Sequence, residues 1–182
     1  MDSTNSYLKQ NFDEYSNFDI ILAHRQNAGY GRFKRNWVDL GMNNIFMSVC
    51  LKSGLFNENF TAIAQYTALI LAKTFQYYSI KPVIKWPNDI LINSKKIAGI
   101  LAETVFNGSK FLGIVLGVGI NISANTVDFS SINQPVTALN IELGVNVDKL
   151  EFINLFMKIF EKNYSSFLKG GFLSFKDDIV ES

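Results

Sequence analysis

KIAGILAETVFNGSKFLGIVLGVGINI, residues 96–122, contains two apolar runs separated by a turn signal. The break between them is Asn-Gly-Ser at 107–109, a combination that favours a tight turn. The two runs therefore predict the strands of a β-hairpin. Shorter runs of the same kind come before it, VIKW at 83–86 and DILI at 89–92, with NSK at 93–95 as another turn signal.

Two further strands are predicted nearer the N-terminus. FDIILA, residues 18–23, is a compact apolar run that is rich in β-forming residues. NIFMSVCLK, residues 44–52, alternates, and a period of two places alternate side chains on one face. The residues on that face are Ile45, Met47, Val49 and Leu51.

Two long helices are predicted to cover the sheet. Apolar residues recur every three or four positions from Asn59 to Tyr78, which is the pattern of an amphipathic helix. Asp148 and Glu151 form a capping-box pattern ahead of a second periodic run, which Gly170-Gly171 closes. Two weaker signals are a cap at Ser3 or Thr4 before a short helix over Asn5–Phe12, and loops with a short helix within 124–146.

Hairpin-linked strands with long helices between them predict an α+β fold, with a mixed, mostly antiparallel sheet covered by helices. A chain of 182 residues with 48% apolar residues can bury one core, so we expect one domain. Seventeen Lys and Arg against sixteen Asp and Glu give a net charge of +1. That balance offers no bulk attraction for nucleic acid or for an anionic membrane. No apolar run reaches the roughly eighteen residues of a membrane span.

The usual nucleophilic and metal-binding sets are not apparent in the sequence. His24, the single histidine, has no partner cysteine with which to make a pair, and Cys50, the single cysteine, can form neither an internal disulfide nor a thiolate cluster. We interpret His24 as structural or exposed and Cys50 as a packing residue. No metal site is predicted, and the cysteine usage favours a cytoplasmic protein.

QNAGYGRFKRNW, residues 26–37, combines two glycines with three cations. Gly29 and Gly31 free the backbone to bend, and Arg32, Lys34 and Arg35 follow within a few residues. Exposed amides and guanidinium groups together bind anions such as carboxylate and phosphate. Taken alone, this loop is equally compatible with a solvated basic turn.

Three other stretches strengthen the case for a site. KWPND at 85–89 packs a cation, an aromatic ring, a forced turn, an amide and an acid at a strand end. KIAG at 96–99 places a lysine before a strand of small residues, and GVGINI at 117–122 ends a strand with Asn121. Gly99 leaves room for a ligand to lie on the backbone. Each stretch could be structural when considered alone.

Together with STN at 3–5, these motifs resemble in order and spacing the biotin protein ligases, the biotin-[acetyl-CoA-carboxylase] ligase family. The resemblance is to the catalytic domain and covers nearly the whole chain. It implies a fold like that of class II aminoacyl-tRNA synthetases and biotin synthetases. It also implies ATP-dependent formation of biotinyl-5'-AMP and transfer of the biotinyl group to a lysine of a biotin carboxyl carrier protein. Magnesium would enter with ATP.

The resemblance assigns roles by position. Lys96, Arg32 and Arg35 match the residues that stabilise charge during adenylate formation, and Trp37 matches a tryptophan near the adenine. Asp89 is expected to partner magnesium or a loop cation. The residues that match biotin or nucleotide contacts are Ser3, Thr4, Asn5, Gln26, Gly29, Tyr30, Gly31, Arg32, Trp37, Asn88, Lys96, Gly99, Leu101, Gly119 and Asn121.

Several departures from the family pattern bear on these expectations. The family loop usually reads Gly-Arg-Gly-Arg, and Tyr30 replaces the first arginine, which predicts one charge fewer beside the ligand. The family normally has a strand before the STN motif, whereas Met1 and Asp2 alone precede Ser3. We expect residues 1–182 to be the catalytic domain, without an N-terminal DNA-binding domain and without the family's small C-terminal barrel.

Two alternatives stay open at this point. Lipoate or octanoate protein ligases share the fold and the adenylate chemistry, although KWPND and the glycine-rich loop favour biotin. A non-catalytic biotin-binding or nucleotide-binding protein is the second alternative. The resemblance further implies a homodimer as one oligomeric state, since relatives dimerise through a sheet edge.

Overall fold

The computed structural model describes all residues except 42, 54–60, 126–128, 130–131 and 172–182. Within the described residues, the centre of the fold is one sheet in the order β1-β2-β6-β5-β4-β3, with every neighbouring pair antiparallel. The strands are β1 (Ile20–Ala23), β2 (Ile45–Lys52), β3 (Val83–Lys85), β4 (Asp89–Ile92), β5 (Lys95–Asn107) and β6 (Lys110–Ile120). The predicted α+β fold with a mostly antiparallel sheet is confirmed.

The predicted hairpin is the longest pairing of the sheet. β5 and β6 align from Ala98 opposite Ile120 to Asn107 opposite Lys110, with a register shift near Val105. β2 pairs with the other edge of β6, so that β6 and β2 lie inside the sheet. This register places Gly99 directly opposite Gly119.

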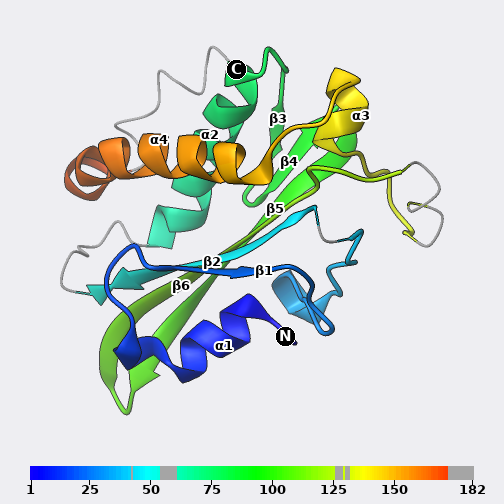
Figure 1. Cartoon of the computed structure of the whole chain (residues 1–182). Helices are drawn as coiled ribbons and strands as arrows, with labels where there is room; N and C mark the ends of the chain where they lie inside the picture. The colour runs from blue at the N-terminus through cyan, green and yellow to red at the C-terminus, as the bar shows by residue number, and fades with distance from the viewer. Residues whose placement is uncertain (42, 54–60, 126–128, 130–131, 172–182) are drawn as a thin grey trace.

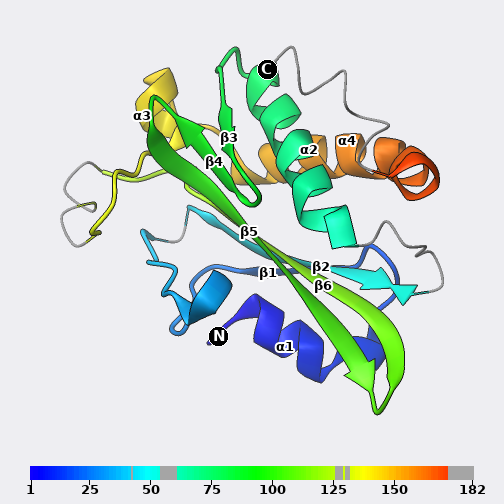
Figure 2. The ribbon, with the colours of Figure 1, turned by 180° about the vertical axis from the view of Figure 1, so that it is seen from behind.

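Helices cover both faces of the sheet (Figures 1 and 2). α2 (Ile63–Tyr77) and α4 (Lys149–Gly170) lie on one face, and α1 (Thr4–Gln10) lies on the other. The remaining helices are short: η1 (Phe12–Glu14), η2 (Arg32–Lys34) and α3 (Leu139–Leu143).

The core is divided between these two faces. The four alternating β2 residues predicted to share a face pack with apolar residues of α2 and α4, such as Phe75 and Phe160. Cys50 points to the opposite face and packs with Leu8 and Phe12 beneath α1. Burial of both faces explains why β2 is apolar along almost its whole length.

The helix boundaries follow the predicted caps closely. Asp148 accepts hydrogen bonds from the amides of Leu150 and Glu151, and Gly171 ends α4 with a φ of 64°. Ser3 caps α1, which stops at Gln10 because the Asn11 side chain binds the Tyr7 carbonyl; Phe12 therefore belongs to η1 instead of the predicted helix.

Three predicted boundaries differ from the structure. The strand predicted from Phe18 begins at Ile20, because Phe18 has a φ of 69° that no strand residue adopts. The helix predicted from Asn59 to Tyr78 is observed as Ile63–Tyr77, and positions 59 and 60 lie outside the described residues. Within 124–146 the predicted short helix is α3.

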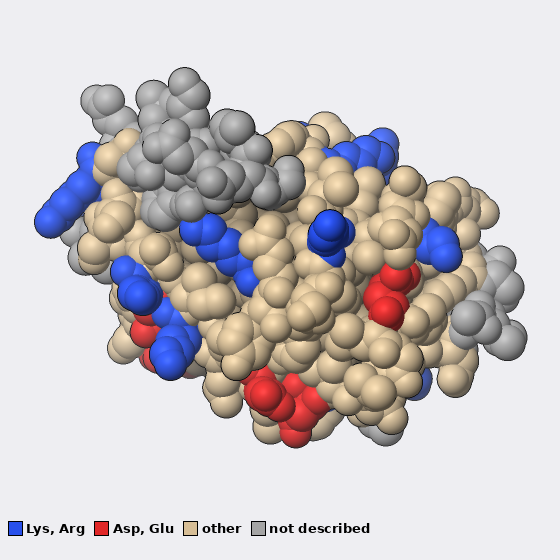
Figure 3. Space-filling model, turned by 90° about the horizontal axis from the view of Figure 1, so that it is seen from above, with Lys and Arg blue, Asp and Glu red and all other residues tan. Residues whose placement is uncertain are grey.

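The charged surface and the hydropathy of the helices were compared with the expectations from the sequence composition. On the face shown in Figure 3, basic and acidic side chains of the described residues lie in separate small groups. A search of the described helices finds none with the length and hydropathy of a membrane span.

Candidate functional site

A cavity of about 240 Å³ lies between the start of α1, the glycine-rich loop and the β4–β5–β6 part of the sheet. The structure brings the predicted site residues together there, with one exception. Gly29 lies just outside the lining, where an added Cβ would come within 2.8 Å of Gln26 Nε2. The predicted residues that line the cavity are Ser3, Thr4, Asn5, Gln26, Tyr30, Gly31, Arg32, Arg35, Trp37, Asn88, Asp89, Lys96, Gly99, Leu101, Gly119 and Asn121.

One end of the cavity is a buried network of hydroxyl and amide groups. Gln26 Oε1 accepts hydrogen bonds from the Thr4 amide (2.7 Å) and from Thr4 Oγ1 (3.1 Å). Ser48 Oγ lies 2.8 Å from Thr4 Oγ1 and donates to Asn5 Oδ1 at 2.5 Å. We call the lining residues Thr4, Asn5 and Gln26, together with Ser48, which bonds Thr4 and Asn5 without lining the cavity, the amide end.

Glu103 on β5 extends this network through Asn5. Its carboxylate accepts hydrogen bonds from Asn5 Nδ2 (2.8 Å), Lys9 Nζ (3.0 Å) and the Tyr30 hydroxyl (3.0 Å). Burial raises the pKa of Glu103, but the hydrogen bonds from Asn5, Lys9 and Tyr30 outweigh burial and hold the pKa below its usual range. Burial also raises the pKa of Tyr30, so at neutral pH Tyr30 is the donor and Glu103 the ionised acceptor.

The small size of Gly117 makes this arrangement possible. A Cβ at Gly117 would come within 2.4 Å of Asn5 Oδ1. Gly117 lies opposite Ser48 in the β2–β6 register, so a serine and a glycine together leave the space that the Asn5 amide fills. The glycines of the GVG stretch therefore mark close packing, as expected when that stretch is considered alone.

The other end of the cavity is rich in cations. Among the described lining residues, four carry positive charge (Arg32, Arg35, Lys85 and Lys96) and one, Asp89, carries negative charge. We call these four cations the cation end. Lys96 Nζ forms an ion pair with Asp89 Oδ1 at 2.8 Å, and their side chains are 17% and 20% exposed. Asp89 was expected to partner magnesium or a loop cation, whereas its cationic partner in this structure is the strand residue Lys96.

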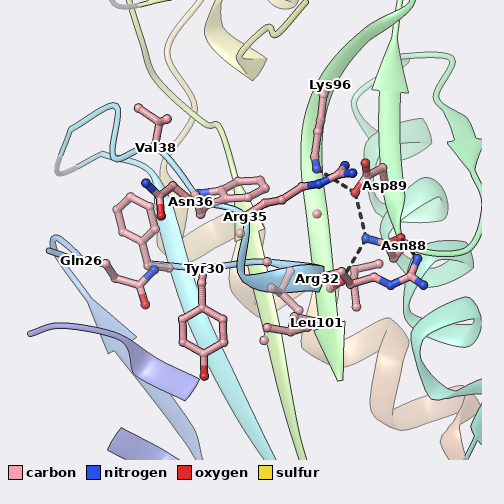
Figure 4. A pocket seen from close by; sticks show the side chains of 18 of the residues that line it. Gln26, Tyr30, Arg32, Arg35, Asn36, Val38, Asn88, Asp89, Lys96 and Leu101 are labelled. Carbon is pink, nitrogen blue, oxygen red and sulfur yellow. Dashed lines mark hydrogen bonds and ion pairs between the residues drawn. The ribbon is translucent and has the colours of Figure 1, made fainter. Parts of the chain in front are cut away.

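A chain of polar contacts runs from this ion pair to the glycine-rich loop (Figure 4). Asn88 Nδ2 donates to Asp89 Oδ1 (3.0 Å), and Asn88 Oδ1 accepts from Arg32 Nη1 (3.0 Å). Arg35 extends toward the same group. Fixed charges and amides from the loop, the β3–β4 turn and β5 thus converge on one place.

Trp37 lies between the two ends. A Cβ at Gly99 or at Gly119 would come within 2.7 Å of its indole, so the ring rests on the backbone of β5 and β6 where two glycines face each other. Lys96 Nζ lies 5.2 Å from the ring centroid, within range of a cation–π contact. The space above Gly99 that the sequence assigned to a ligand is therefore occupied by Trp37.

Two site residues also support the structure around them. Asn121 is 5% exposed and donates from Nδ2 to the Thr137 carbonyl at 3.0 Å. The Lys96 backbone bonds Pro135 and Thr137, which anchors the start of β5 next to residues 135–137. The ligand contacts expected of Asn121 and Lys96 stay predictions.

The Tyr30 side chain points away from Arg32, Arg35 and Lys96 and toward α1 (Figure 4). The sequence predicted that replacing arginine by Tyr30 removes a positive charge beside the ligand. In the structure this position faces Glu103 instead, so the substitution removes a charge from beside that carboxylate.

Sequence reasoning missed several residues of the site. Ser48 and Glu103 are polar side chains within apolar strands, and that pattern could have identified them, because buried polar groups require partners. Lys85 opens the KWPND motif but received no role. The two residues set aside earlier fit their interpretations: His24 is exposed, and burial raises the pKa of the Cys50 thiol to about 11.

Comparisons with known proteins identify the family of the chain. A model of the biotin/lipoate A/B protein ligase family matches residues 1–121. The biotin--[acetyl-CoA-carboxylase] ligase of Paracoccus denitrificans is 31% identical over 170 residues, which cover 88% of this chain and 69% of that protein. The bifunctional ligase/repressor BirA of Bacillus subtilis is 30% identical over 159 residues, which cover 86% of this chain and 49% of that protein. The chain thus spans about half the length of the BirA proteins it matches.

A solved structure supports the same relationship. The biotin protein ligase of Aquifex aeolicus, in complex with biotin and ATP, superposes with a TM-score of 0.83 at 28% identity. The superposition covers 98% of this chain and 73% of that one. The sheet and the helices on its two faces are therefore features of an established fold, and the chain belongs to the biotin/lipoate A/B protein ligase family, among the biotin protein ligases.

Proposed function

We propose that the chain activates biotin with ATP to form biotinyl-5'-AMP and transfers the biotinyl group to a lysine of a biotin carboxyl carrier protein. The observation that carries this proposal is the union, in one cavity, of buried hydroxyl and amide side chains with a group of four cations. The Aquifex aeolicus relative was solved with biotin and ATP, which supports the choice of ligands. ATP-dependent chemistry also fits the cytoplasmic location predicted from the sequence.

The first step brings two anions together. A carboxylate oxygen of biotin must attack the α-phosphorus of ATP, and at about 4 Å and an effective dielectric near 20 each pair of unit charges repels by roughly 4 kcal/mol. The new carboxyl–phosphorus bond replaces the bond to the leaving pyrophosphate. Such a transfer depends on positioning and fixed charge more than on a covalent protein nucleophile.

Lys96 is the proposed principal charge stabiliser. It emerges from the start of β5 beside Trp37, and its ammonium lies near the Arg32–Asn88 contact. Asp89 holds the ammonium in place until an anionic ligand arrives. A charge that is positioned in advance stabilises the transition state without reorganisation.

The amide end would hold the ureido group of biotin. Ser3, Thr4, Asn5 and Gln26 offer oxygen and nitrogen atoms there, and Leu101 contributes to the apolar wall. Because Gln26 and Ser48 already fix Thr4 and Asn5, little side-chain freedom would be lost on binding.

The nucleotide would occupy the cation end. Arg32 and Arg35 would bind phosphate oxygens, and Trp37 would contact the adenine. Asp89 is the carboxylate among the described lining residues, and no group of three or more His, Cys, Asp or Glu side chains in the described part of the chain could hold a metal ion. The donor set therefore fits a magnesium ion carried by the triphosphate oxygens rather than a protein cage.

In the second step the carrier lysine attacks the carbonyl carbon of the mixed anhydride, and AMP leaves. The loop at Gly29–Trp37 would shield the anhydride from water until the carrier arrives. Association of the chain into a homodimer stays a prediction.

Incubation with biotin, Mg-ATP and a biotin carboxyl carrier domain, followed by intact mass measurement, tests the proposal. We expect the carrier to gain the mass of one biotinyl group, and a carrier whose acceptor lysine is replaced by arginine should gain nothing. Absence of the adduct would favour the non-catalytic binding protein. Modification by lipoate or octanoate in place of biotin would favour the second enzymatic alternative.

A further inference from the structure

The glycine-rich loop is closed on itself by backbone hydrogen bonds. The Trp37 amide donates to the Gly29 carbonyl (2.9 Å), and the Gly31 amide donates to the Arg35 carbonyl (2.8 Å). Residues 29–37 therefore form one small unit. That unit carries Arg32, Arg35 and Trp37, the loop residues assigned to phosphate and adenine.

Besides the packing of Trp37 on β5 and β6, side-chain hydrogen bonds attach this unit to other described residues at two places. Arg32 Nη1 donates to Asn88 Oδ1 at the cation end, in an exposed contact between an ion and a neutral amide. On the opposite side, the Tyr30 hydroxyl donates to Glu103 Oε2 at 3.0 Å and lies 3.4 Å from Ser6 Oγ.

The contact to Glu103 is the stronger of the two on physical grounds. It is partly buried, its acceptor is ionised, and Lys9 and Asn5 hold the carboxylate from other directions. Each contact pairs one charged group with one neutral group, so burial decides between them, and water competes least where the pair is shielded. An exposed arginine–amide contact is weakened by solvent.

The closed shape of the loop includes local backbone strain. Phe33 and Lys34 have φ angles of 57° and 58°, in a region that residues with a Cβ seldom adopt. Phe33 is 80% exposed, so core packing does not hold it there. Strain of this kind persists only where surrounding contacts hold the segment in place.

We propose that Tyr30 and Glu103 are positioning residues, and that their hydrogen bond is a latch that keeps the Gly29–Trp37 loop over the cavity. The inference rests on the proposed function for its consequence, which is that the latch sets how long the adenylate is retained. Glu103 also fixes the Asn5 amide through Nδ2, so the same carboxylate orders both the loop and the amide end.

Limited trypsin digestion without ligand tests the latch independently of activity. The loop holds three trypsin sites, at Arg32, Lys34 and Arg35. In Tyr30→Phe we expect cleavage at these sites on the order of tenfold faster than in the wild type, because loss of a hydrogen bond to a charged group favours loop opening. Glu103→Gln, which keeps the side-chain size, should show the same direction of change.

Two matched variants complete this experiment. Tyr77→Phe removes the hydroxyl of an exposed tyrosine on α2 and should digest like the wild type. Tyr30→Arg keeps a donor facing Glu103 but adds a trypsin site, so the three proteins are also digested with a protease that cuts after lysine alone; in Tyr30→Arg cleavage at Lys34 should be as slow as in the wild type. Equal cleavage rates in the wild type and in Tyr30→Phe would overturn the latch, as would equally fast cleavage at Lys34 in Tyr30→Arg and Tyr30→Phe.

A pulse–chase measurement of the bound adenylate separates the latch from the proposed function. Enzyme loaded with biotin and radiolabelled ATP is chased with unlabelled ATP, and the retained label is followed with time. We expect Tyr30→Phe to form the adenylate and to lose it on the order of tenfold faster than the wild type, with slow loss restored in Tyr30→Arg. Equal retention in Tyr30→Phe and the wild type would overturn the latch. A wild type that forms no adenylate would instead overturn the proposed function, while the trypsin result would still decide whether the latch exists.

Discussion

The two ends of the cavity hold their polar groups in different ways. At the amide end, Thr4, Asn5 and Ser48 are at most 4% exposed, and each is bonded to another member of the network. At the cation end, Arg32, Arg35 and Lys85 are exposed, whereas Lys96 is 17% exposed and paired with Asp89. One end is therefore a fixed part of the core, and the other is a set of long side chains at the surface.

This difference suggests how the protein divides recognition from chemistry. A buried network selects a neutral polar group strictly, because any ligand that leaves one of its members unpaired is penalised. In the proposed reaction, the three exposed cations can instead follow the charge of a triphosphate as it changes, while Asp89 holds Lys96 in advance. Mutations at the cation end should therefore lower mainly the reaction rate, and mutations at the amide end should lower stability and biotin affinity.

Removing the Lys96 charge should have the largest effect on turnover. We expect Lys96→Ala to slow adenylate formation by on the order of 100-fold or more, as loss of a preorganised charge contact commonly does. Single-turnover assays with labelled ATP measure this step. Lys95→Ala, at the exposed neighbouring position, is the matched control. An unchanged rate in Lys96→Ala would remove that residue from the mechanism.

A change at the amide end should lower stability as well as biotin affinity. Ser48→Ala leaves Asn5 Oδ1 without its donor inside the core, which typically costs about 1–3 kcal/mol. Chemical denaturation gives the free energy of unfolding, and calorimetry gives the biotin affinity. Thr74→Val removes another buried hydroxyl, which donates to the Ile70 carbonyl within α2, and should have a much smaller effect. Similar losses in both variants would show that the network has no special role.

Trp37 joins the two ends, and its removal should affect the nucleotide more than the fold. Base–aromatic stacking contributes about 1–3 kcal/mol, so Trp37→Ala should weaken ATP binding on the order of tenfold. Melting curves with and without biotin and ATP would separate the two effects, with Tyr77→Ala as an exposed aromatic control. A lower melting temperature without any change in the ligand-induced shift would make Trp37 a purely structural residue.

The smallest effect concerns the pH dependence of stability. The pKa of Glu103 is lower in the folded state than in the unfolded state, where it is about 4.3. Below that pH the unfolded chain binds more protons than the folded chain, so the protein becomes less stable as the pH decreases. The contribution of the ionised carboxylate is complete above that value and is lost as the pH falls through the folded pKa. The stability difference between the wild type and Glu103→Gln should therefore shrink on acidification. Glu161→Gln, on the exposed face of α4, should show no such change.

Period and turn signals predicted most of the fold correctly. The β5–β6 hairpin, the alternation of β2 and the caps of α4 depend on neighbours in sequence, which a local pattern can report. The start of β1 was wrong because Phe18 packs against Phe160 and Tyr164, a tertiary contact that no local pattern contains.

The same distinction between local patterns and tertiary contacts applies to the site. Lys96, Arg32 and Trp37 lie in motifs, so their approach to one cavity could be expected. The partners of Tyr30 could not, because Glu103 lies 73 positions further along the chain and is brought near only by the sheet. For the same reason, the sequence could not show that Trp37 covers Gly99.

Exchange of labelled pyrophosphate into ATP, measured with biotin and separately with lipoate, tests whether an acid bound at the amide end reacts with ATP bound at the cation end. The cavity described above predicts exchange that depends on biotin and that falls at least about 100-fold in Lys96→Ala. Exchange with lipoate alone, or none with either acid, would contradict the assignment of biotin to the amide end and of ATP to the cation end.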